Sequence, residues 1–203
     1  MSPPHILAID QGTSGTKAVL VDAAGTVTAT ATYRLTQRHP GTGLVEQSPY
    51  AIWASVLQAT AALTARAGGE VAAVALSTQR ESVLLWDTAT GAPLSPVVSW
   101  QDRRGAARCR ALTAAQAAFV TDVTGLPVDP MFSATKAAAL LDTYDPDRRA
   151  ARAGAIRVGT LDAWLLRRLT GTDRTEVGNA SRTLLLDLAT GDWHPELLDL
   201  FDV

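Results

Sequence analysis

A turn rich in glycine and hydroxyl groups, residues 12–15 (Gly-Thr-Ser-Gly), lies between two short apolar runs. Such a turn can direct several backbone N–H groups and its hydroxyls towards an anion. Asp10 precedes the turn and could hold Mg²⁺ through water, since this ion keeps most of its water ligands. Lys17 follows the turn and could place a positive charge near a phosphate. The alternative is an ordinary hairpin turn, and the turn taken alone does not decide between the two.

A second polar group, Thr78–Ser82, separates two other apolar runs. In it, Arg80 offers several hydrogen-bond donors and Glu81 offers two acceptor oxygens. A polyhydroxylated ligand needs both, because each hydroxyl donates one hydrogen bond and also accepts. Further along the chain, Trp100 could pack on the carbon face of a sugar or polyol. The structural alternatives are an Arg–Glu pair within a loop and a tryptophan of the core or its rim.

Short apolar runs and turn signals indicate the elements that must position these residues. Three strands are predicted at 5–10, 17–22 and 26–35, joined as an antiparallel meander. Ser48 and Pro49 then begin a helix, which Gly68 and Gly69 are expected to end. Residues 71–76 form a continuous apolar run, which predicts a strand that is covered on both faces.

The remainder of the chain alternates strands with helices. Further strands are predicted at 83–86, 155–158 and 183–188. Helices are predicted at 102–112, 113–123, 160–169 and 195–201, and Ser133 is expected to cap another. Strands followed by alternating strands and helices predict an α/β domain with a mixed sheet flanked by helices. No linker rich in proline, glycine and serine divides the chain, which indicates one domain over residues 1–203.

Composition and charge exclude several classes of protein. The 203 residues are 47% apolar and 19% charged, which excludes a disordered chain. No run of about 18 apolar residues occurs, so no membrane span is expected. The net charge of -2 disfavours a nucleic-acid partner held by a broad basic face. The single cysteine, Cys109, and the lack of a secretory signal at the amino terminus favour a cytoplasmic location.

Seven short motifs occur in the order known from one protein family. They are Asp10–Lys17, Gln79–Glu81, Val98–Arg104, Thr124–Pro130, Phe132–Lys136, Gly159–Trp164 and Asn179–Thr183. Over essentially its whole length the chain resembles the amino-terminal domain of the FGGY carbohydrate kinases, and the glycerol kinase members most of all. Any one of the motifs is weak, whereas seven in order over this length are specific.

The resemblance implies a ribonuclease-H-like fold of the actin and hexokinase superfamily. It implies transfer of the γ-phosphoryl group of ATP to a hydroxyl of glycerol or a related polyol or ketose. ATP and Mg²⁺ are then the cofactors, and a small polyol or sugar is the partner. Asp10 would be the metal-associated acid, and glycerol would contact Arg80, Glu81 and Trp100. The implied phosphate-binding residues are Gly12, Thr13, Ser14 and Lys17.

The sequence also departs from the family pattern. Met131 stands where glycerol kinases usually carry a substrate-bonding tyrosine, which makes a different polyol or a ketose plausible. Many of these kinases have arginine at the position of Lys17. The general base and the carboxy-terminal domain are expected beyond Val203, so no catalytic residue is assigned here and the chain alone is predicted to be inactive. The full-length protein could form a homo-oligomer. The alternatives are another FGGY kinase, such as a xylulokinase, and a non-catalytic nucleotide-binding module of the same fold.

Overall fold

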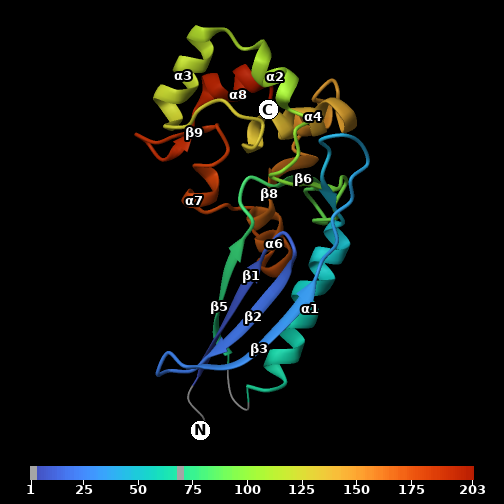
Figure 1. Ribbon diagram of the computed structural model, residues 1–203, viewed down its shortest axis with the longest axis vertical. Coiled ribbons are helices and arrows are strands. Elements are labelled where there is room, and N and C mark those ends of the chain that lie inside the picture. The colour runs from blue at the N-terminus through green and yellow to red at the C-terminus, as the bar shows by residue number, and fades with distance from the viewer. Residues whose placement is uncertain (1–3, 68–70) are drawn as a thin grey trace. The chain divides into compact units, whose positions relative to one another are not determined.

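The computed structural model describes residues 4–67 and 71–203, which fall into two compact units (Figure 1). Within these ranges, the first unit takes the residues up to Gln37 together with Gln47–Gln79. The second unit takes Arg38–Glu46 and Arg80–Val203. The prediction of a single domain over residues 1–203 concerns the extent of the family domain and stays a prediction.

The first unit contains the predicted meander. Strand β1 (His5–Gln11) pairs antiparallel with β2 (Gly15–Val21), which pairs antiparallel with β3 (Val27–Arg34). Leu7 and Ile9 of β1 are buried, whereas their neighbours Ile6, Ala8 and Asp10 are more exposed. This alternation is the pattern of a sheet with one covered face. The meander prediction is therefore confirmed.

Helix α1 (Pro49–Thr64) covers that face of the sheet (Figure 1). Ser48 is the N-cap, and its Oγ accepts a hydrogen bond of 3.3 Å from the backbone N–H of Ala51, as expected for serine before a first-turn proline. The apolar stripe is fully buried and consists of Ile52, Val56, Ala59 and Leu63. Gly68 and Gly69, which were expected to end this helix, lie outside the described residues.

Strand β5 (Val71–Thr78) runs parallel to β1 at the edge of the sheet, whose order is β3-β2-β1-β5. The prediction that both of its faces are covered is wrong, since Val74 is 53% exposed. The physical reason is its position, because α1 packs on β1, β2 and β3 and β5 lies beside them. A continuous apolar run does not by itself distinguish a central strand from an edge strand.

The second unit is built on a sheet of order β4-β7-β6-β8. Its strands are β4 (Glu46–Gln47), β7 (Val97–Val98), β6 (Val83–Asp87) and β8 (Ile156–Thr160). Helix α4 (Ser133–Tyr144) packs Leu140 and Leu141 against Val83, Leu85 and Val98 of this sheet. The predicted strands at 83–86 and 155–158 thus form the antiparallel pair β6–β8.

A second apolar cluster is formed by residues distant in sequence, including Val120, Phe132, Leu184, Leu197 and Phe201. Val120 lies in α3 (Ala114–Thr124), and Leu197 and Phe201 lie in α8 (Pro195–Phe201). Phe132 directly precedes α4, and Leu184 precedes β9 (Leu186–Asp187). The remaining elements are α2 (Ala106–Ala111), α5 (Arg149–Arg152), α6 (Leu161–Thr170), α7 (Val177–Ala180) and β10 (Asp192–Trp193).

Two of these elements are shorter than predicted. Helix α2 begins at Ala106, because residues 102–104 form a turn around the Asp102 carboxylate, which accepts hydrogen bonds from Arg104. The strand predicted at 183–188 is reduced to β9. Leu184 has a φ of 66°, in the left-handed region, and this conformation interrupts an extended strand.

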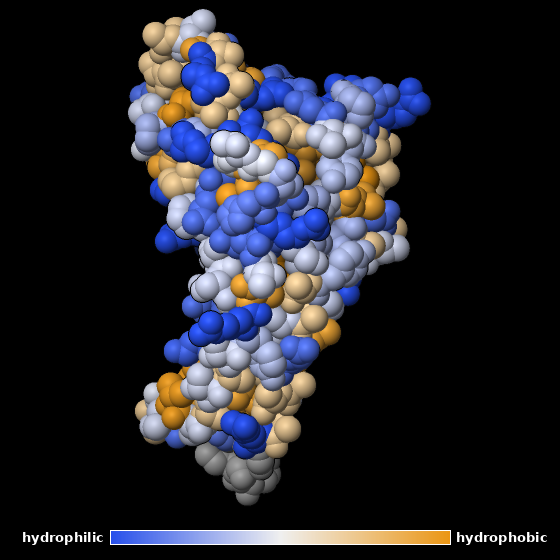
Figure 2. All heavy atoms as spheres, turned by 45° about the vertical axis from the view of Figure 1, so that its right-hand side comes forward, coloured by the Kyte–Doolittle hydropathy of each residue, from blue (hydrophilic) through white to orange (hydrophobic). Residues whose placement is uncertain are grey.

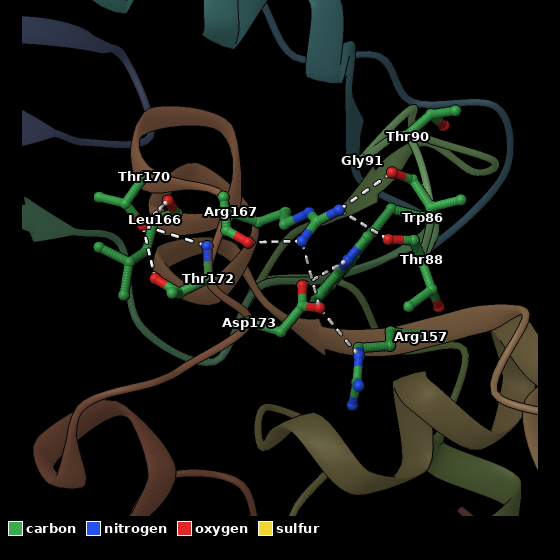
Figure 3. A network of polar contacts seen from close by, with 12 residues as sticks. Trp86, Thr88, Thr90, Gly91, Arg157, Leu166, Arg167, Thr170, Thr172 and Asp173 are labelled. Carbon is green, nitrogen blue, oxygen red and sulfur yellow. Dashed lines mark hydrogen bonds and ion pairs between the residues drawn. The ribbon is translucent and has the colours of Figure 1, made fainter.

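A polar network connects β6 and β8 with the segment that follows α6 (Figure 3). Asp173 accepts hydrogen bonds of 3.2 Å from the Trp86 indole and from Arg157 Nε. Arg167 of α6 donates to the carbonyl groups of Thr88 and Ala89 at 2.8 and 3.1 Å. These bonds fix the hairpin end of β6 against α6, which also contacts β8.

In the described ranges, no helix is long and apolar enough to cross a membrane. On the face drawn in Figure 2, the hydrophobic residues form small groups separated by polar and charged ones. Isolated apolar residues of this kind are normal on protein surfaces.

Candidate functional site

The turn rich in glycine and hydroxyl groups forms the loop between β1 and β2. The N–H of Gly12 donates to the carbonyl of Gly15 at 2.9 Å, and the N–H of Leu35 donates to the carbonyl of Ser14 at 3.0 Å. Asp10 and Lys17 are cross-strand partners and are both exposed. Cross-strand partners share one face of a sheet. The loop is thus a β-hairpin, as the structural alternative expected, and it carries a carboxylate and an ammonium group on one face.

Three buried glutamines form a hydrogen-bond network that contacts this loop. Gln11, Gln47 and Gln79 are 0%, 1% and 8% exposed. The Gln79 side-chain amide donates to Gln47 Oε1 at 2.8 Å, and Gln47 Nε2 donates to the carbonyl of Thr13 at 2.8 Å. Thr13 Oγ1 donates to Gln79 Oε1 at 3.3 Å. Buried amides in a satisfied network rigidify their surroundings, so the loop is held in one conformation.

Sequence reasoning missed the roles of Gln11 and Gln47. The sequence signal for Gln11 was weak. This residue ends an apolar run, where a polar side chain is ordinarily expected to be exposed and not buried. Gln47 lies 34 residues from the Thr13 carbonyl that it binds, and no local pattern reports such a contact.

Alanine at position 15 is expected to destabilise the hairpin by about 1–3 kcal/mol. A Cβ on Gly15 would lie 2.5 Å from the Tyr33 carbonyl oxygen, which is backbone and cannot move away without disturbing β3. Gly12 is the matched control, because a Cβ there would be 3.5 Å from its nearest neighbour. Urea unfolding should therefore separate Gly15→Ala from Gly12→Ala, and equal midpoints would contradict the close approach.

In the second unit, Glu81 lies at the centre of the other candidate site. Its side chain is 11% exposed and accepts a hydrogen bond of 2.7 Å from Arg182 Nε. The Arg182 guanidinium carbon lies 4.8 Å from the centre of the Phe132 ring, a cation–π contact. Glu81 has a φ of 64°, a left-handed conformation that costs a non-glycine residue roughly 1–3 kcal/mol. Its carbonyl accepts a hydrogen bond of 3.2 Å from Ser133 Oγ.

The other residues that were predicted to contact a polyol or sugar lie around Glu81 and Arg182. Arg80 precedes Glu81 directly and is exposed. Trp100 is 36% exposed, and its N–H donates at 3.1 Å to Ser82 Oγ, one residue beyond Glu81. Met131 is partly buried and precedes Phe132, whose ring contacts Arg182. The structure therefore gathers Glu81, Trp100 and Met131 through short chains of contacts.

Ser133 does not cap α4 as the sequence suggested. The N-cap is Phe132, which makes no side-chain capping bond, and Ser133 is the first helical residue. Its hydroxyl binds the Glu81 carbonyl instead. The cap signal therefore predicted the helix start within one residue, and it was wrong for the partner of the hydroxyl.

Asp102 forms a buried tie beside the site. Its carboxylate is fully buried and accepts hydrogen bonds from the Val45 N–H at 2.7 Å and from Arg104 Nε at 2.9 Å. Arg104 also donates to Glu46 at 2.7 Å. This group anchors Arg38–Glu46 to the turn that follows Trp100, so it fixes the position of that tryptophan.

Lys136 of α4 is also fully buried near Glu81. Burial lowers the pKa of Lys136 from 10.5 to about 7, against the opposing effects of Glu81, Asp102 and Asp129, which raise it. Its Nζ donates to the carbonyl groups of Met131 and Pro130. Only the Phe132–Lys136 motif contained this residue in the sequence, and nothing local revealed its burial.

The buried lysine should make stability depend on pH. The folded-state pKa lies below the unfolded value, so the unfolded chain binds more protons between about pH 7 and pH 10. The lysine contribution to the unfolding free energy therefore rises with pH in this window, by at most about 1.4 kcal/mol per pH unit. Urea unfolding of the wild type and Lys136→Met from pH 6 to 9.5 should show curves that diverge above pH 7. Parallel curves would contradict the burial of the amine.

The hairpin loop has a donor set that fits nucleotide phosphates with Mg²⁺. Lys17 and the Ser14 hydroxyl can donate to phosphate oxygens, and Asp10 supplies one carboxylate. The Thr13 hydroxyl has one proton, which it donates to Gln79, so it can bind a phosphate only by exchanging that bond. In the part of the chain that the structure describes, no group of three or more His, Cys, Asp or Glu residues could hold a metal ion. A single carboxylate is nevertheless what Mg²⁺ uses when water and substrate phosphates complete its shell.

Comparison with known proteins shows which family has a similar sequence and structure. The sequence matches the FGGY family of carbohydrate kinases, N-terminal domain, over residues 5–203. The glycerol kinase of Rhodospirillum centenum is 47% identical, over 98% of this chain and 41% of that protein. The apulose kinase of Pectobacterium atrosepticum is 42% identical, over 100% of this chain and 42% of that protein. A crystal structure of Plasmodium falciparum glycerol kinase with ADP has a TM-score of 0.91 at 26% identity, over 99% of this chain and 41% of that one.

These relatives are kinases of small polyols and sugars, and this defines the class of domain. The chain belongs to the FGGY family of carbohydrate kinases and corresponds to its N-terminal domain. The predicted resemblance and the α/β fold of the actin and hexokinase superfamily are confirmed, and the alternative of a non-catalytic module is not favoured. The chain spans about 41% of the length of the curated relatives that it matches first.

Proposed function

We propose that the chain forms the substrate-side part of an ATP-dependent kinase for a small polyol or sugar. The observation that carries the proposal is the buried Glu81 carboxylate, held by Arg182 and preceded by exposed Arg80. A carboxylate has about four acceptor positions, of which the described bond to Arg182 uses one. The remaining capacity and the Arg80 donors suit neighbouring hydroxyl groups, and Trp100 suits their carbon face.

For the phosphate donor, we propose binding at the hairpin loop of the first unit. Lys17, Thr13 and Ser14 would hold phosphate oxygens of ATP, and Asp10 would hold Mg²⁺ through water. When bound, ATP would supply the phosphoryl group and Mg²⁺ would neutralise part of the charge on the phosphate oxygens. The residues of the chain orient the phosphates, and the glutamine network keeps the loop in place. The general base is proposed to lie outside this chain. We therefore expect no polyol-dependent ADP formation by the chain alone, and rates of about 1–100 s⁻¹ would contradict this.

The acceptor is proposed to be glycerol or a related polyol or ketose. The relatives are named for glycerol and apulose, and another solved structure is a xylulose kinase of Lactobacillus acidophilus, with a TM-score of 0.86 at 25% identity. Met131 favours a ketose as the second candidate, because its thioether packs and cannot donate a hydrogen bond to a hydroxyl. A site with one fewer hydroxyl partner discriminates differently among polyols.

A thermal-shift panel on the chain tests both proposals. The ligands are glycerol, D-xylulose and MgATP, each alone and combined. A ligand at 100 times its dissociation constant adds about 2.7 kcal/mol to the unfolding free energy. The double variant Arg80→Ala/Glu81→Ala should lose the polyol shift and keep the MgATP shift, whereas Asp10→Asn should do the reverse. Polyols also stabilise proteins as excluded solutes. A polyol shift that survives in the double variant would therefore count against the site.

Two further expectations stay predictions. A cytoplasmic location would be tested by fractionating cells that express the protein. The homo-oligomer of the full-length protein would be tested by sedimentation.

A further inference from the structure

The turn that precedes α4 accepts hydrogen bonds from the buried amine of Lys136. Lys136 is fully buried, and both of its hydrogen bonds within the described residues go to backbone carbonyls, those of Met131 and Pro130. A buried amine is costly unless its donors are satisfied, and buried carbonyls are costly without donors. A lysine at this place therefore has a specific partner, which is the backbone of residues 130–131.

Two other kinds of contact hold this turn: apolar packing, since Phe132 belongs to the second apolar cluster and Met131 packs against it, and hydrogen bonds within the turn. The N–H of Met131 donates to Asp129 Oδ1 at 2.7 Å, and the N–H of Phe132 donates to the Asp129 carbonyl at 3.2 Å. These are bonds within the turn, which shape it but do not attach it to the rest of the second unit. Lys136 supplies the polar attachment of this turn to α4, in addition to the apolar packing of Phe132 and Met131.

Residues 129–132 also position the residues that are expected to bind the polyol or sugar that accepts the phosphoryl group. Met131 is one of them, and the Phe132 ring lies under the Arg182 guanidinium, which binds Glu81. The carbonyl of Glu81 is bound by Ser133, which follows Phe132. A shift of residues 131–133 would therefore move the partners of Glu81 on both of its sides.

We propose that Lys136 is a positioning residue for the acceptor site, whose buried ammonium group fixes residues 129–132 and through them Met131 and the Arg182–Glu81 pair. The effect on ligands rests on the proposed function, whereas the effect on the turn does not.

The protonation of Lys136 distinguishes this role from simple core packing. The charged groups that face it are Glu81 before β6, Asp102 and Arg104 before α2, and Asp129 before α4. Loss of the proton removes the positive charge among three carboxylates. It also weakens the bonds to the two carbonyl groups without breaking either, because a neutral amine keeps two N–H donors that are poorer than those of an ammonium group. As the pH rises through about 7, the turn should therefore loosen and acceptor affinity should fall.

The first experiment needs no ligand. The chain has two lysines, Lys17 and Lys136, and two methionines, Met1 and Met131. Selective ¹³C labelling of both residue types gives two lysine Cε resonances and two methionine methyl resonances. The variant Met131→Leu assigns the methionine signals. Lys136 should titrate with a midpoint near pH 7, and the Met131 methyl should move with the same midpoint. In Lys136→Arg, which keeps its charge, this movement of Met131 should vanish. In Lys136→Met, the Met131 resonance should be displaced at every pH. A Met131 methyl that is independent of pH in the wild type would overturn the proposal, even if the variants fail to fold.

The second experiment measures glycerol and D-xylulose binding by calorimetry at pH 6 and pH 8.5. The wild type should bind about tenfold more weakly at pH 8.5, and Lys136→Arg should show less than a twofold difference. Leu140→Val, a buried change on the same helix, controls for lost stability and should keep the wild-type pH dependence. An equal pH dependence in Lys136→Arg would overturn the proposal. Absence of all binding by the wild type would instead count against the proposed function, and the methionine titration would still decide the role of Lys136.

Discussion

Replacing Asp102 by alanine is expected to lower the free energy of unfolding at pH 7 by roughly 3–5 kcal/mol. The carboxylate is fully buried, and its removal leaves Arg104, 18% exposed, with Glu46 as its remaining counter-charge. The Val45 N–H loses its acceptor at the same time. Breaking a buried ion pair from one side costs more than the pair itself contributes, because the remaining charge stays desolvated. Urea unfolding followed by circular dichroism measures this loss.

The size of the effect should follow burial. Glu46, which binds the same guanidinium, is 20% exposed, so Glu46→Ala should cost about 1 kcal/mol. Asp147, whose side chain is 60% exposed, is the outer control, and Asp147→Ala should change stability by less than about 0.5 kcal/mol. Asp102→Asn keeps an acceptor oxygen and should be intermediate. If Asp102→Ala were no more destabilising than Glu46→Ala, the Asp102 carboxylate would not anchor Arg38–Glu46 as its bonds to Val45 and Arg104 indicate.

Replacing Arg182 by alanine should weaken polyol binding by about 30- to 100-fold, or roughly 2–3 kcal/mol. The variant leaves Glu81, 11% exposed, without its 2.7 Å partner, and removes the group that holds this carboxylate in place. The left-handed backbone of Glu81 would then have less to compensate for its strain. Calorimetric titration with whichever polyol gives the selective thermal shift measures the loss.

Two variants separate the Arg182 effect from a general loss of positive charge. Arg149 is 87% exposed, and Arg149→Ala should leave affinity unchanged. Arg182→Lys keeps the charge but not the planar group that stacks on Phe132, so it should recover part of the affinity. Wild-type affinity in Arg182→Ala, with the fold intact, would show that Glu81 does not need this partner.

The parts of the fold that the sequence predicted correctly depend on contacts between near neighbours. The meander follows from three apolar runs separated by tight turns, and the start of α1 follows from Ser48 and Pro49. The helices at 114–124 and 195–201 were predicted within one residue at each end. In each case the signal and the structure that it determines lie within a few residues of one another.

The parts that it could not predict depend on distant partners. Glu81 and Arg182 are 101 residues apart in sequence, and a pattern search could name both without pairing them. The same holds for the exposure of β5, which depends on what packs beside it, and for the burial of Lys136. The site residues were therefore found by type and order, whereas the groups that hold them became visible only in three dimensions.

The division of the chain has a consequence for how it can be cut. The backbone passes from the first unit to the second after Gln37, returns after Glu46, and leaves again after Gln79. Neither unit is thus a continuous stretch of sequence. A ribosome must release the chain beyond Gln79 before the first unit has all its residues, and by then Arg38–Glu46 still awaits Asp102. A single cut after Gln79 would leave the first unit with Arg38–Glu46 as an internal segment that has lost Asp102, and would leave the second unit without that segment.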